Sequence, residues 1–428
     1  MRAASLGLQD SAVPGVAVVA DGDTLGGLLA SVGQELLDRS YLRYKPGTSL
    51  VATLRLADGP AFAYAVSDAA RPKLAKLVDR APQGAVLLHR PEDGVLVARP
   101  AADRDLPGVA DPHRLTRLVG PVTRWTTLAY KPQRRWVARP AEDPVPRAVV
   151  RAYRPEDLPG ALAGWQLAAR LAEAVTDPGV TDGSGFTVPA LLASLPRYGL
   201  AAVEWSPGEP LDRLMQAEQV PTEVLAGVGG ALARLHGSLG SRAAHRSTPL
   251  DHVVVPVLRE LAAVRPDLAR RGRALHRELA ASAPRPLREH PIHGDFSTDQ
   301  VILDEGRIGF ADWDRAGWGD PAADLGSLRA AGLPAGAYPA LLAGYDRVRE
   351  VPSTVDWYAR VEGMRRLTEP LRRCDGAWRT AIEARLTALE CGGAAPVSGP
   401  MSGPMAGPVS GPMAGPVSGS VGVRVTVR

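Results

Sequence analysis

Residues 291–325, PIHGDFSTDQVILDEGRIGFADWDRAGWGDPAADL, decide the fold. This stretch carries eight acidic residues and one histidine. Apolar residues on both sides of Asp304-Glu305-Gly306 predict a β-hairpin over residues 300–312. A hairpin brings its two ends together, so a loop that enters it can face a residue that leaves it. We therefore expect Asp295 and Asp312 to lie close to each other.

This arrangement of acids is typical of phosphoryl transfer. Such a site needs one carboxylate that accepts a hydroxyl proton, and further carboxylates with an amide that hold Mg²⁺ on nucleotide phosphates. Asp295 follows His293-Gly294, and Gln300 comes five residues later, which is the spacing of a catalytic aspartate and a metal-binding amide. Asp312 follows the second predicted strand, where kinases place a metal-binding aspartate.

Two linked segments carry a resemblance to a known family. HGDFSTDQ, residues 293–300, resembles the HGDxxxxN signature of aminoglycoside phosphotransferases and of choline and sugar kinases. ADWDRAGWGDPAADL, residues 311–325, resembles the acidic segment that continues it. VEWSPGEPL, residues 203–211, is similar to the interlobe hinge of that family, and ALARLH, residues 231–236, to the helix that follows. The resemblance covers residues 127–389 and implies an α+β, protein-kinase-like fold with a small β-rich N-lobe and a large helical C-lobe.

The resemblance also implies roles in catalysis and metal binding. Asp295 would be the catalytic base, Asp312 the principal Mg²⁺ ligand, and Gln300 the second metal position. The family usually has Asn at that last position, so the longer glutamine could shift the metal geometry. His293 and Asp324 would hold the catalytic loop through hydrogen bonds.

For the nucleotide, ATP or GTP, the resemblance implies three contact residues. Glu204 and Trp205 lie in the hinge, and Arg151 stands where the family has a strand lysine that contacts phosphates. Arginine keeps the charge of lysine but differs in reach and shape. No clear counterpart of the helix glutamate that pairs with this lysine is present, and Gln166 and Glu173 are candidates.

The chain divides into four expected parts. These are an N-terminal α+β cap (1–120), a kinase-like N-lobe (121–205), a helical C-lobe with the catalytic and metal-binding loops (206–391), and a disordered tail (392–428). The tail consists of PVSG-like and PMAG-like repeats, in which Pro and Gly prevent helix and sheet from propagating. The cap would be similar in layout to the cap of bacterial maltokinases.

A short phrase occurs twice, in YLRYKPGTSLVA (41–52) and LAYKPQRRWVA (128–138). It indicates either an internal repeat, with the cap derived from part of the N-lobe, or a common strand-turn-strand pattern. In the second copy, Lys131, Arg134 and Arg135 could cover phosphates where a glycine-rich loop would sit, or form a solvated basic turn.

Hydrophobic periodicity predicts the remaining elements. Strands are expected over 41–56 as a hairpin, 62–66, 128–138 and 148–154. Helices are expected over 24–39, 71–78, 159–174, 221–236, 253–279, 339–348 and 354–389.

The composition of the 428 residues excludes several classes of protein. Hydrophobic residues make up 45% and charged residues 22%, which is typical of a globular protein. The net charge of +4 comes from basic residues spread along the chain, so we expect no nucleic-acid partner. No apolar run is long enough to span a bilayer and no secretory signal is evident, so we expect no membrane association and a cytoplasmic location. Cys374 and Cys391 are expected to be unpaired thiols, and the oligomeric state stays open.

The favoured function is transfer of the γ-phosphate of ATP or GTP to a hydroxyl of a small molecule such as an aminoglycoside, a sugar or a choline-like alcohol. The acceptor would lie between Asp295 and residues 354–389, where Asp356, Glu362 and Glu369 could meet a cationic ligand or form a solvated helix face. The alternatives are a catalytically impaired nucleotide-binding pseudokinase, a peptide-binding module, and a kinase acting on Ser or Thr of a peptide.

Overall fold

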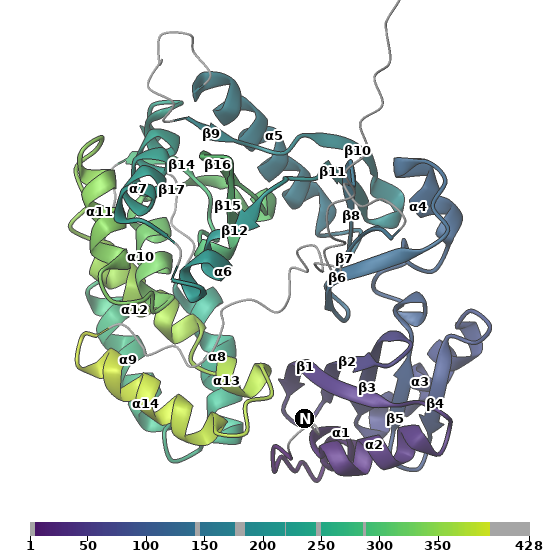
Figure 1. Cartoon of the computed structure of the whole chain (residues 1–428). Helices are drawn as coiled ribbons and strands as arrows, with labels where there is room; N and C mark the ends of the chain where they lie inside the picture. Colours follow the sequence, from purple (N-terminus) through teal and green to yellow (C-terminus); the bar gives the residue numbers. More distant parts are fainter. Residues whose placement is uncertain are drawn as a thin grey trace, which may run out of the picture.

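The computed structural model describes residues 5–141, 146–175, 185–218, 220–244, 250–285 and 288–393. The predicted disordered tail falls outside the described residues from position 394 onward. The fold is α+β, as predicted, with β-rich parts toward the N-terminus and a helical part toward the C-terminus. Figure 1 shows the cap in purple below the blue second sheet, with the green and yellow helices opposite both.

The cap, residues 5–120, is built on an antiparallel five-stranded sheet of order β1-β2-β3-β5-β4. The predicted turn at Pro46-Gly47 joins β1 to β2, and Lys45 pairs with Ser49. The strands are β1 (Leu36–Lys45), β2 (Ser49–Leu56), β3 (Gly59–Val66), β4 (Val86–Arg90) and β5 (Val95–Ala98). The helices are α1 (Gly15–Ala20), α2 (Gly22–Ala30), α3 (Arg71–Arg80) and α4 (Pro112–Val119).

The helix predicted over residues 24–39 was too long. Helix α2 ends at Ala30, because the chain turns at Gly33, whose φ of 74° is left-handed, and then enters β1 at Leu36. The apolar residues beyond Ala30 matched a helical period although they belong to a strand that pairs with β2.

The second sheet has the order β10-β11-β8-β7-β6. Along the chain, β6, β7 and β8 form a meander, helix α5 follows, and β10 and β11 form a hairpin. Strand β11 of this hairpin pairs with β8. The cap sheet follows the same order, with α3 in the place of α5. The elements are β6 (Trp125–Lys131), β7 (Arg135–Pro140), β8 (Ala148–Tyr153), α5 (Leu158–Val175), β10 (Leu191–Leu195) and β11 (Leu200–Glu204).

The helical lobe contains α6 (Leu211–Gln216), α7 (Thr222–Gly237), α8 (Leu250–Val264), α9 (Ala269–Ala281), α10 (Ala322–Ala330), α11 (Ala337–Asp346), α12 (Val355–Arg365), α13 (Glu369–Arg372) and α14 (Trp378–Glu390). Two predicted long helices are interrupted. Residues 253–279 form α8 and α9, which are separated around Pro266, because proline disfavours helical geometry in the preceding residue. Residues 354–389 form α12, α13 and α14, and Cys374, with a φ of 59°, ends the segment that contains α13.

The predicted hairpin over residues 300–312 is confirmed by β15 (Val301–Asp304) and β16 (Arg307–Phe310). It belongs to a four-stranded sheet of order β12-β15-β16-β9, with β12 at Glu209–Pro210 and β9 at Phe186–Thr187. A further small sheet, β13-β14-β17, joins Arg242–Ala243, Arg288–Ile292 and Gly317–Gly319. Apart from β15 and β16, the strands of these two sheets were not predicted. Strands β9, β12, β13 and β17 have only two or three residues each, and β14 does not alternate apolar with polar residues.

Both faces of the cap sheet are buried, each in a different core. Successive side chains of a strand point to opposite faces. In β2, Leu50 and Ala52 join a core with α1, α2 and the helices of the lobe, whereas Val51 joins a core with the second sheet. In the core that the cap shares with the helical lobe, the Trp378 Nε1–H of α14 donates to the Leu6 carbonyl oxygen at 3.0 Å. The cap therefore connects the second sheet to the far end of the helical lobe.

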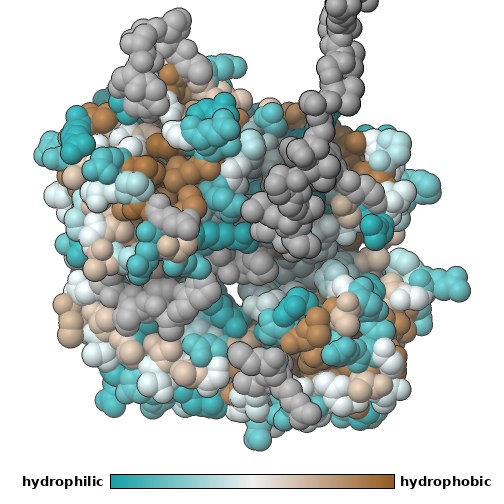
Figure 2. All heavy atoms as spheres, in the orientation of Figure 1, coloured by the Kyte–Doolittle hydropathy of each residue, from teal (hydrophilic) through white to brown (hydrophobic). Residues whose placement is uncertain are grey.

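The outer surface is mainly polar. Figure 2 shows hydrophilic residues over much of this face, with hydrophobic patches over the helical lobe and the cap. Within the described ranges, no helix is both long enough and apolar enough to cross a membrane. Cys374 and Cys391 are free thiols.

The cap also holds the turn between β6 and β7. The buried Asp103 carboxylate accepts hydrogen bonds from the Tyr130 hydroxyl at 3.0 Å and from the Gln133 backbone N–H at 2.7 Å. The Arg43 guanidinium donates to the Gln133 side-chain oxygen. Burial raises the pKa of Asp103 to about 6, although these hydrogen bonds act in the opposite direction.

This pKa predicts how stability depends on pH. Native Asp103 keeps its proton to a higher pH than unfolded aspartate, so its contribution is greatest below pH 3.8 and is lost as the pH rises through about 6. In the wild type, this group should lower the free energy of unfolding by about 1–3 kcal/mol between pH 4 and 7, and Asp103→Asn should abolish that decrease. Urea unfolding across this pH range measures it. Asp68→Asn, at an exposed cap position, is the control and should keep the wild-type slope, and an equal slope in Asp103→Asn would contradict the prediction.

Helices α7 and α11 touch through glycines. A Cβ on Gly229 would lie 1.8 Å from the Leu341 carbonyl oxygen, and one on Gly344 would lie 1.8 Å from that of Ala226. By contrast, Gly227 is exposed on the same helix and a Cβ there would meet only the end of Ile308 at 3.5 Å.

We predict opposite effects of alanine at these two positions of α7. Gly229→Ala should lower the free energy of unfolding by about 1–3 kcal/mol, because α11 must move away. Gly227→Ala should raise it by about 0.5–1 kcal/mol, because alanine favours helix without a clash. Chemical denaturation of both variants tests the pair, and a Gly229→Ala protein as stable as wild type would show that the helices are not held this closely.

Candidate active site

The β15–β16 hairpin brings the predicted catalytic and metal-binding residues to one end. Val301 pairs with Phe310, and the Ala311 N–H donates to the Gln300 backbone oxygen at 2.9 Å. Asp312 follows at once, in the left-handed conformation with φ 62°. The loop that carries Asp295 enters the hairpin on the other side, as the local pattern predicted.

Asp324 fixes the shape of this loop. Its carboxylate is buried and accepts from the backbone N–H groups of His293 at 2.7 Å and Gly294 at 2.9 Å. It also contacts His236 Nε2 at 3.1 Å. Burial opposes ionisation, but the hydrogen bond and the charge of His236 hold the pKa of Asp324 below its usual value. Gly294 has a φ of 80°, and a Cβ there would lie 2.2 Å from the Arg315 carbonyl oxygen, so this position requires glycine.

His293 joins the loop to the end of the hairpin. Its Nε2 lies 2.8 Å from the Ala311 carbonyl oxygen, and its ring packs against the rings of Phe296 and Trp313. The side chain is fully buried. His293 and Asp324 thus both hold backbone of the loop and hairpin, and neither faces the opening where Asp295 lies.

Asp312 is held by two arginines of the second sheet. Arg135 Nη1 lies 2.9 Å and 3.1 Å from the two oxygens of Asp312, and Arg151 Nη1 lies 2.5 Å from Oδ1. Strand alternation explains the convergence, because Arg135 shares its face with Val137 and Arg151 shares its face with Val149, both of which point toward the hairpin. Burial alone would oppose ionisation, but these two guanidinium groups hold the pKa of Asp312 far below its usual range.

Asp314 completes this ion network and was not singled out from the sequence. It accepts from Arg135, from Arg151, from the Tyr153 hydroxyl at 2.8 Å and from Trp165 Nε1 at 3.0 Å. Its place two residues after Asp312 was the available signal.

The two candidates for pairing with Arg151 lie elsewhere. Gln166 and Glu173 are exposed on α5, whereas Arg151 pairs with Asp312 and Asp314.

The three basic residues of the turn between β6 and β7 differ in where they lie. Arg135 forms ion pairs with Asp312 and Asp314. Lys131 lies close enough for the charges of Arg135, Asp312 and Asp295 to act on its pKa, whereas Arg134 is exposed.

Gln300 and Asp312 suit a hard metal ion. The Gln300 amide nitrogen donates to Asp299 Oδ2 at 3.0 Å, but its Oε1 is buried and accepts no hydrogen bond from any described residue. Mg²⁺ takes oxygen ligands, needs few of them from the protein, and keeps waters and phosphate oxygens for the rest. Among the described residues, no three or more His, Cys, Asp or Glu side chains are grouped to hold a metal, so water and phosphate oxygens would supply most of the ligands of an ion bound here.

A cleft lies between the second sheet and the hairpin. Apolar side chains line its walls, Glu204 and Trp205 lie at the hinge, and Arg151 and Asp312 lie with them along the lining. The Glu204 N–H donates to the Ala190 carbonyl oxygen and the Trp205 N–H to that of Arg147. A base bound at the hinge would therefore hydrogen-bond with other groups of that segment.

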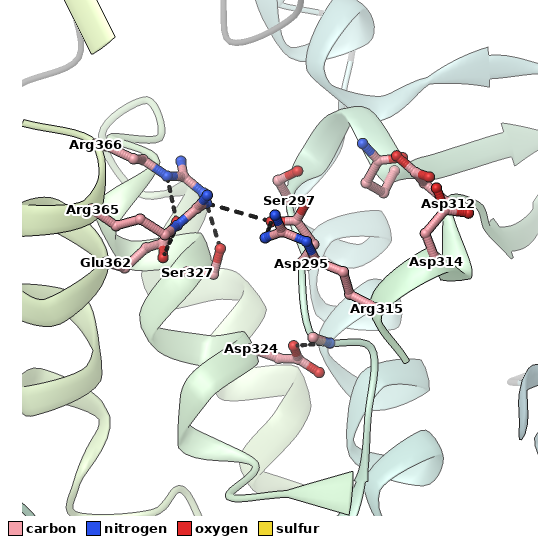
Figure 3. A network of polar contacts seen from close by, with 12 residues as sticks. Asp295, Ser297, Asp312, Asp314, Arg315, Asp324, Ser327, Glu362, Arg365 and Arg366 are labelled. Atoms are coloured by element: carbon pink, nitrogen blue, oxygen red, sulfur yellow. Dashed lines mark hydrogen bonds and ion pairs between the residues drawn. The ribbon is translucent and has the colours of Figure 1, made fainter. Parts of the chain in front are cut away.

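Asp295 is partly exposed. Its Oδ1 is 3.4 Å from Arg315 Nη1 and 3.4 Å from Arg365 Nη2. Figure 3 shows it between the Asp312–Asp314 pair and the arginines of α12.

The acids expected near a cationic acceptor are already paired. Glu362 forms ion pairs with Arg365 and Arg366. Glu369 is paired with Arg373, and Asp356 with Arg329. None of the three is left as an unpaired carboxylate toward the site.

The sequence model described as the phosphotransferase enzyme family (APH) matches residues 130–361, which is more than half of the chain. The chain belongs to this family. The match begins at Tyr130 and includes the whole hairpin, the loop that carries Asp295 and most of α12, whereas the cap lies outside it. The fold is thus the two-lobed, protein-kinase-like one that the two sequence segments indicated.

Solved structures of related proteins were also compared. A choline/ethanolamine kinase family protein from Mesorhizobium loti is 19% identical, with a TM-score of 0.45 over 68% of this chain and 94% of that chain. A thermostable mutant of aminoglycoside phosphotransferase APH(4)-Ia is 14% identical, with a TM-score of 0.46 over 64% and 96%. The APH(2")-IIa of a gentamicin complex is 12% identical, with a TM-score of 0.45 over 64% and 94%. The comparison with curated proteins found no match.

In this APH-family chain, the buried Asp324 should be important for stability. Asp324→Asn replaces one acceptor oxygen by a donor, so the N–H of His293 or of Gly294 would lose its partner inside the protein. We expect the free energy of unfolding to fall by about 2–4 kcal/mol. Thermal or urea unfolding measures the loss. Asp304→Asn, at the partly exposed end of β15 where Asp304 pairs with Arg307, is the control and should change stability by less than about 1 kcal/mol. Equal stability of the two variants would show that Asp324 does not hold the loop.

Proposed function

We propose that this protein transfers the γ-phosphate of ATP or GTP to a hydroxyl group of a small molecule. The observation that carries the proposal is the convergence of Asp295, Gln300 and Asp312 at one end of the β15–β16 hairpin, beside a cleft lined by the hinge. Membership of the phosphotransferase enzyme family supports the reaction class.

Asp295 is the proposed base. Among the described residues, its hydrogen bonds and ion pairs go to Arg315 and Arg365, and both reach Oδ1, so Oδ2 is open to an acceptor hydroxyl. The hydroxyl oxygen forms a bond to the γ-phosphorus as the bond to the bridging oxygen of the β-phosphate breaks, and the hydroxyl proton passes to Asp295. In such a loose transition state, orientation of the hydroxyl matters more than basicity.

Gln300 Oε1 and Asp312 would hold Mg²⁺. When bound, the metal neutralises charge on the phosphates. Arg135 and Arg151 donate hydrogen bonds to Asp312, so phosphates that meet Asp312 through the metal would lie beside both arginines. One guanidinium group can donate two parallel hydrogen bonds to the oxygens of a phosphate. We propose that they contact the phosphates from the sheet side, and that Glu204 and Trp205 border the base.

A second candidate rests on the same ion network. Asp312 is paired with Arg151, in the position of the family's strand lysine, and with Arg135. If these pairs persist when nucleotide binds, the protein would be a nucleotide binder without turnover. Both candidates predict binding, so turnover decides between them.

The test compares wild type with Asp295→Ala and Asp312→Ala in Mg²⁺-dependent hydrolysis of ATP and GTP. Asp295→Ala should bind nucleotide as wild type does and lose about 10²–10⁴-fold in turnover, because the base is removed. Asp312→Ala should lose both turnover and the Mg²⁺ dependence of nucleotide binding, measured by calorimetry.

The control is Asp356→Asn, an exposed position on α12 whose contact is Arg329, which should keep wild-type turnover. Tight nucleotide binding without turnover in wild type, with every acceptor tried, would favour the second candidate.

A further inference from the structure

The acceptor side of Asp295 is built from guanidinium groups. Arg315 comes from the segment that follows Asp312, and Arg365 is the last residue of α12. The two belong to different elements, yet each places one nitrogen 3.4 Å from the same oxygen of Asp295. Figure 3 shows Arg365 and Arg366 on the side of Asp295 away from Asp312.

Cations outnumber carboxylates in this contact network. Glu362 accepts from Arg365 Nε at 2.7 Å and from Arg366 Nε at 2.6 Å. Burial opposes its ionisation, but the two arginines lower the pKa of Glu362 to about 2. With Arg315 included, three guanidinium groups meet two carboxylates, Asp295 and Glu362. Among these five groups, the guanidinium groups are in excess by one.

The contacts to Asp295 are the weak members of the network. Both are 3.4 Å long, whereas charge-assisted pairs of this kind are usually 2.7–2.9 Å. The side chain of Arg315 is 52% exposed and that of Arg365 is 31% exposed, so a ligand can reach them. An anion that enters here would offer both arginines a closer partner than Asp295 does.

Such an exchange would also favour the chemistry. A substrate anion that pairs with Arg315 and Arg365 would draw them away from Asp295 Oδ1 and leave this carboxylate to the acceptor hydroxyl.

We propose that Arg315 and Arg365 bind an anionic group of the acceptor, so that the substrates are hydroxylated small molecules with a carboxylate or phosphate near the hydroxyl that is phosphorylated. This inference rests on the proposed phosphotransfer function and narrows its acceptor. It disfavours polycationic acceptors, since the nearby acids Glu362, Glu369 and Asp356 are all occupied by arginines.

The experiment uses sets of ligands that share a skeleton and differ in charge. One set is glucose, glucosamine, glucuronate and glucose 6-phosphate, and a second is glycerol, glycerate and glycerol 3-phosphate. Binding to the full chain with Mg²⁺ and ADP is measured by calorimetry, and phosphorylation with ATP is measured in parallel. The carboxylate and phosphate members distinguish the two kinds of anion.

In at least one set, we expect an anionic member to bind about 10-fold or more tightly than its neutral counterpart, as one charge-assisted contact allows. Arg365→Gln and Arg315→Gln should each reduce this preference by about 10-fold and raise the KM for the anionic acceptor. The KM for ATP should stay within about twofold, because neither arginine lies in the nucleotide cleft.

Two controls separate specificity from folding. Arg365→Lys keeps the charge and should keep part of the preference. Arg329→Gln removes an arginine of α10 that pairs with Asp356 of α12. Arg329 has no described contact with Asp295, so this variant should leave the ranking of ligands unchanged. Arg315 is more exposed than Arg365, so Arg315→Gln tests the proposal even if Arg365→Gln folds poorly.

Tighter binding of neutral or amino members, no binding by any anionic member, or an equal loss for all members in Arg365→Gln would each overturn the anion site. Failure of the phosphotransfer function is recognised separately, as wild-type protein that binds nucleotide and shows no Mg²⁺-dependent turnover.

Discussion

The ion pairs that join Asp312 and Asp314 to Arg135 and Arg151 are the constraint on which the site depends. They connect two strands of the second sheet to the end of a hairpin more than 150 positions away in the chain. Without the arginines, two largely buried carboxylates would lie side by side, which is strongly unfavourable. The network therefore holds the sheet at one position relative to the hairpin, and this sets the cleft, the hinge and the position of Gln300 together. The left-handed backbone of Asp312 belongs to the same arrangement, because it turns the carboxylate toward the sheet.

Local pattern was enough to predict the hairpin, the loop that carries Asp295 and the helical lobe, because each depends on residues close in sequence. The repeated Tyr-Lys-Pro motif left two interpretations open, an internal repeat or a common strand-turn-strand pattern, and the strand order that the two sheets share is compatible with the first. What the sequence could not show are pairings between distant segments. Nothing near Arg365 indicates that it reaches Asp295, and Arg135 resembled a solvated turn residue until the strand face to which it belongs was known. Helix lengths failed where a single left-handed residue, Gly33 or Cys374, interrupts a pattern that periodicity alone continues.

The family segments recognised in the sequence cover the proposed nucleotide side of the site better than the proposed acceptor side. On the proposed nucleotide side, Gln300 and Asp312 follow the spacing that the resemblance implies, and Arg151 stands where the resemblance places a lysine. On the proposed acceptor side, Arg315 directly follows the Asp312 segment, whereas Arg365 ends α12 beyond the matched region.

The cap shares one apolar core with the second sheet and another with α8, α9 and α14. The two lobes are thereby joined twice, by the hinge strand on one side and by the cap on the other. Two bodies joined only by a hinge can swing apart, but three bodies that contact one another in a closed ring cannot open unless one of the apolar contacts is broken. Because the Asp103 carboxylate also holds the turn between β6 and β7, the cap fixes the two strands whose Leu128 and Val137 line the cleft.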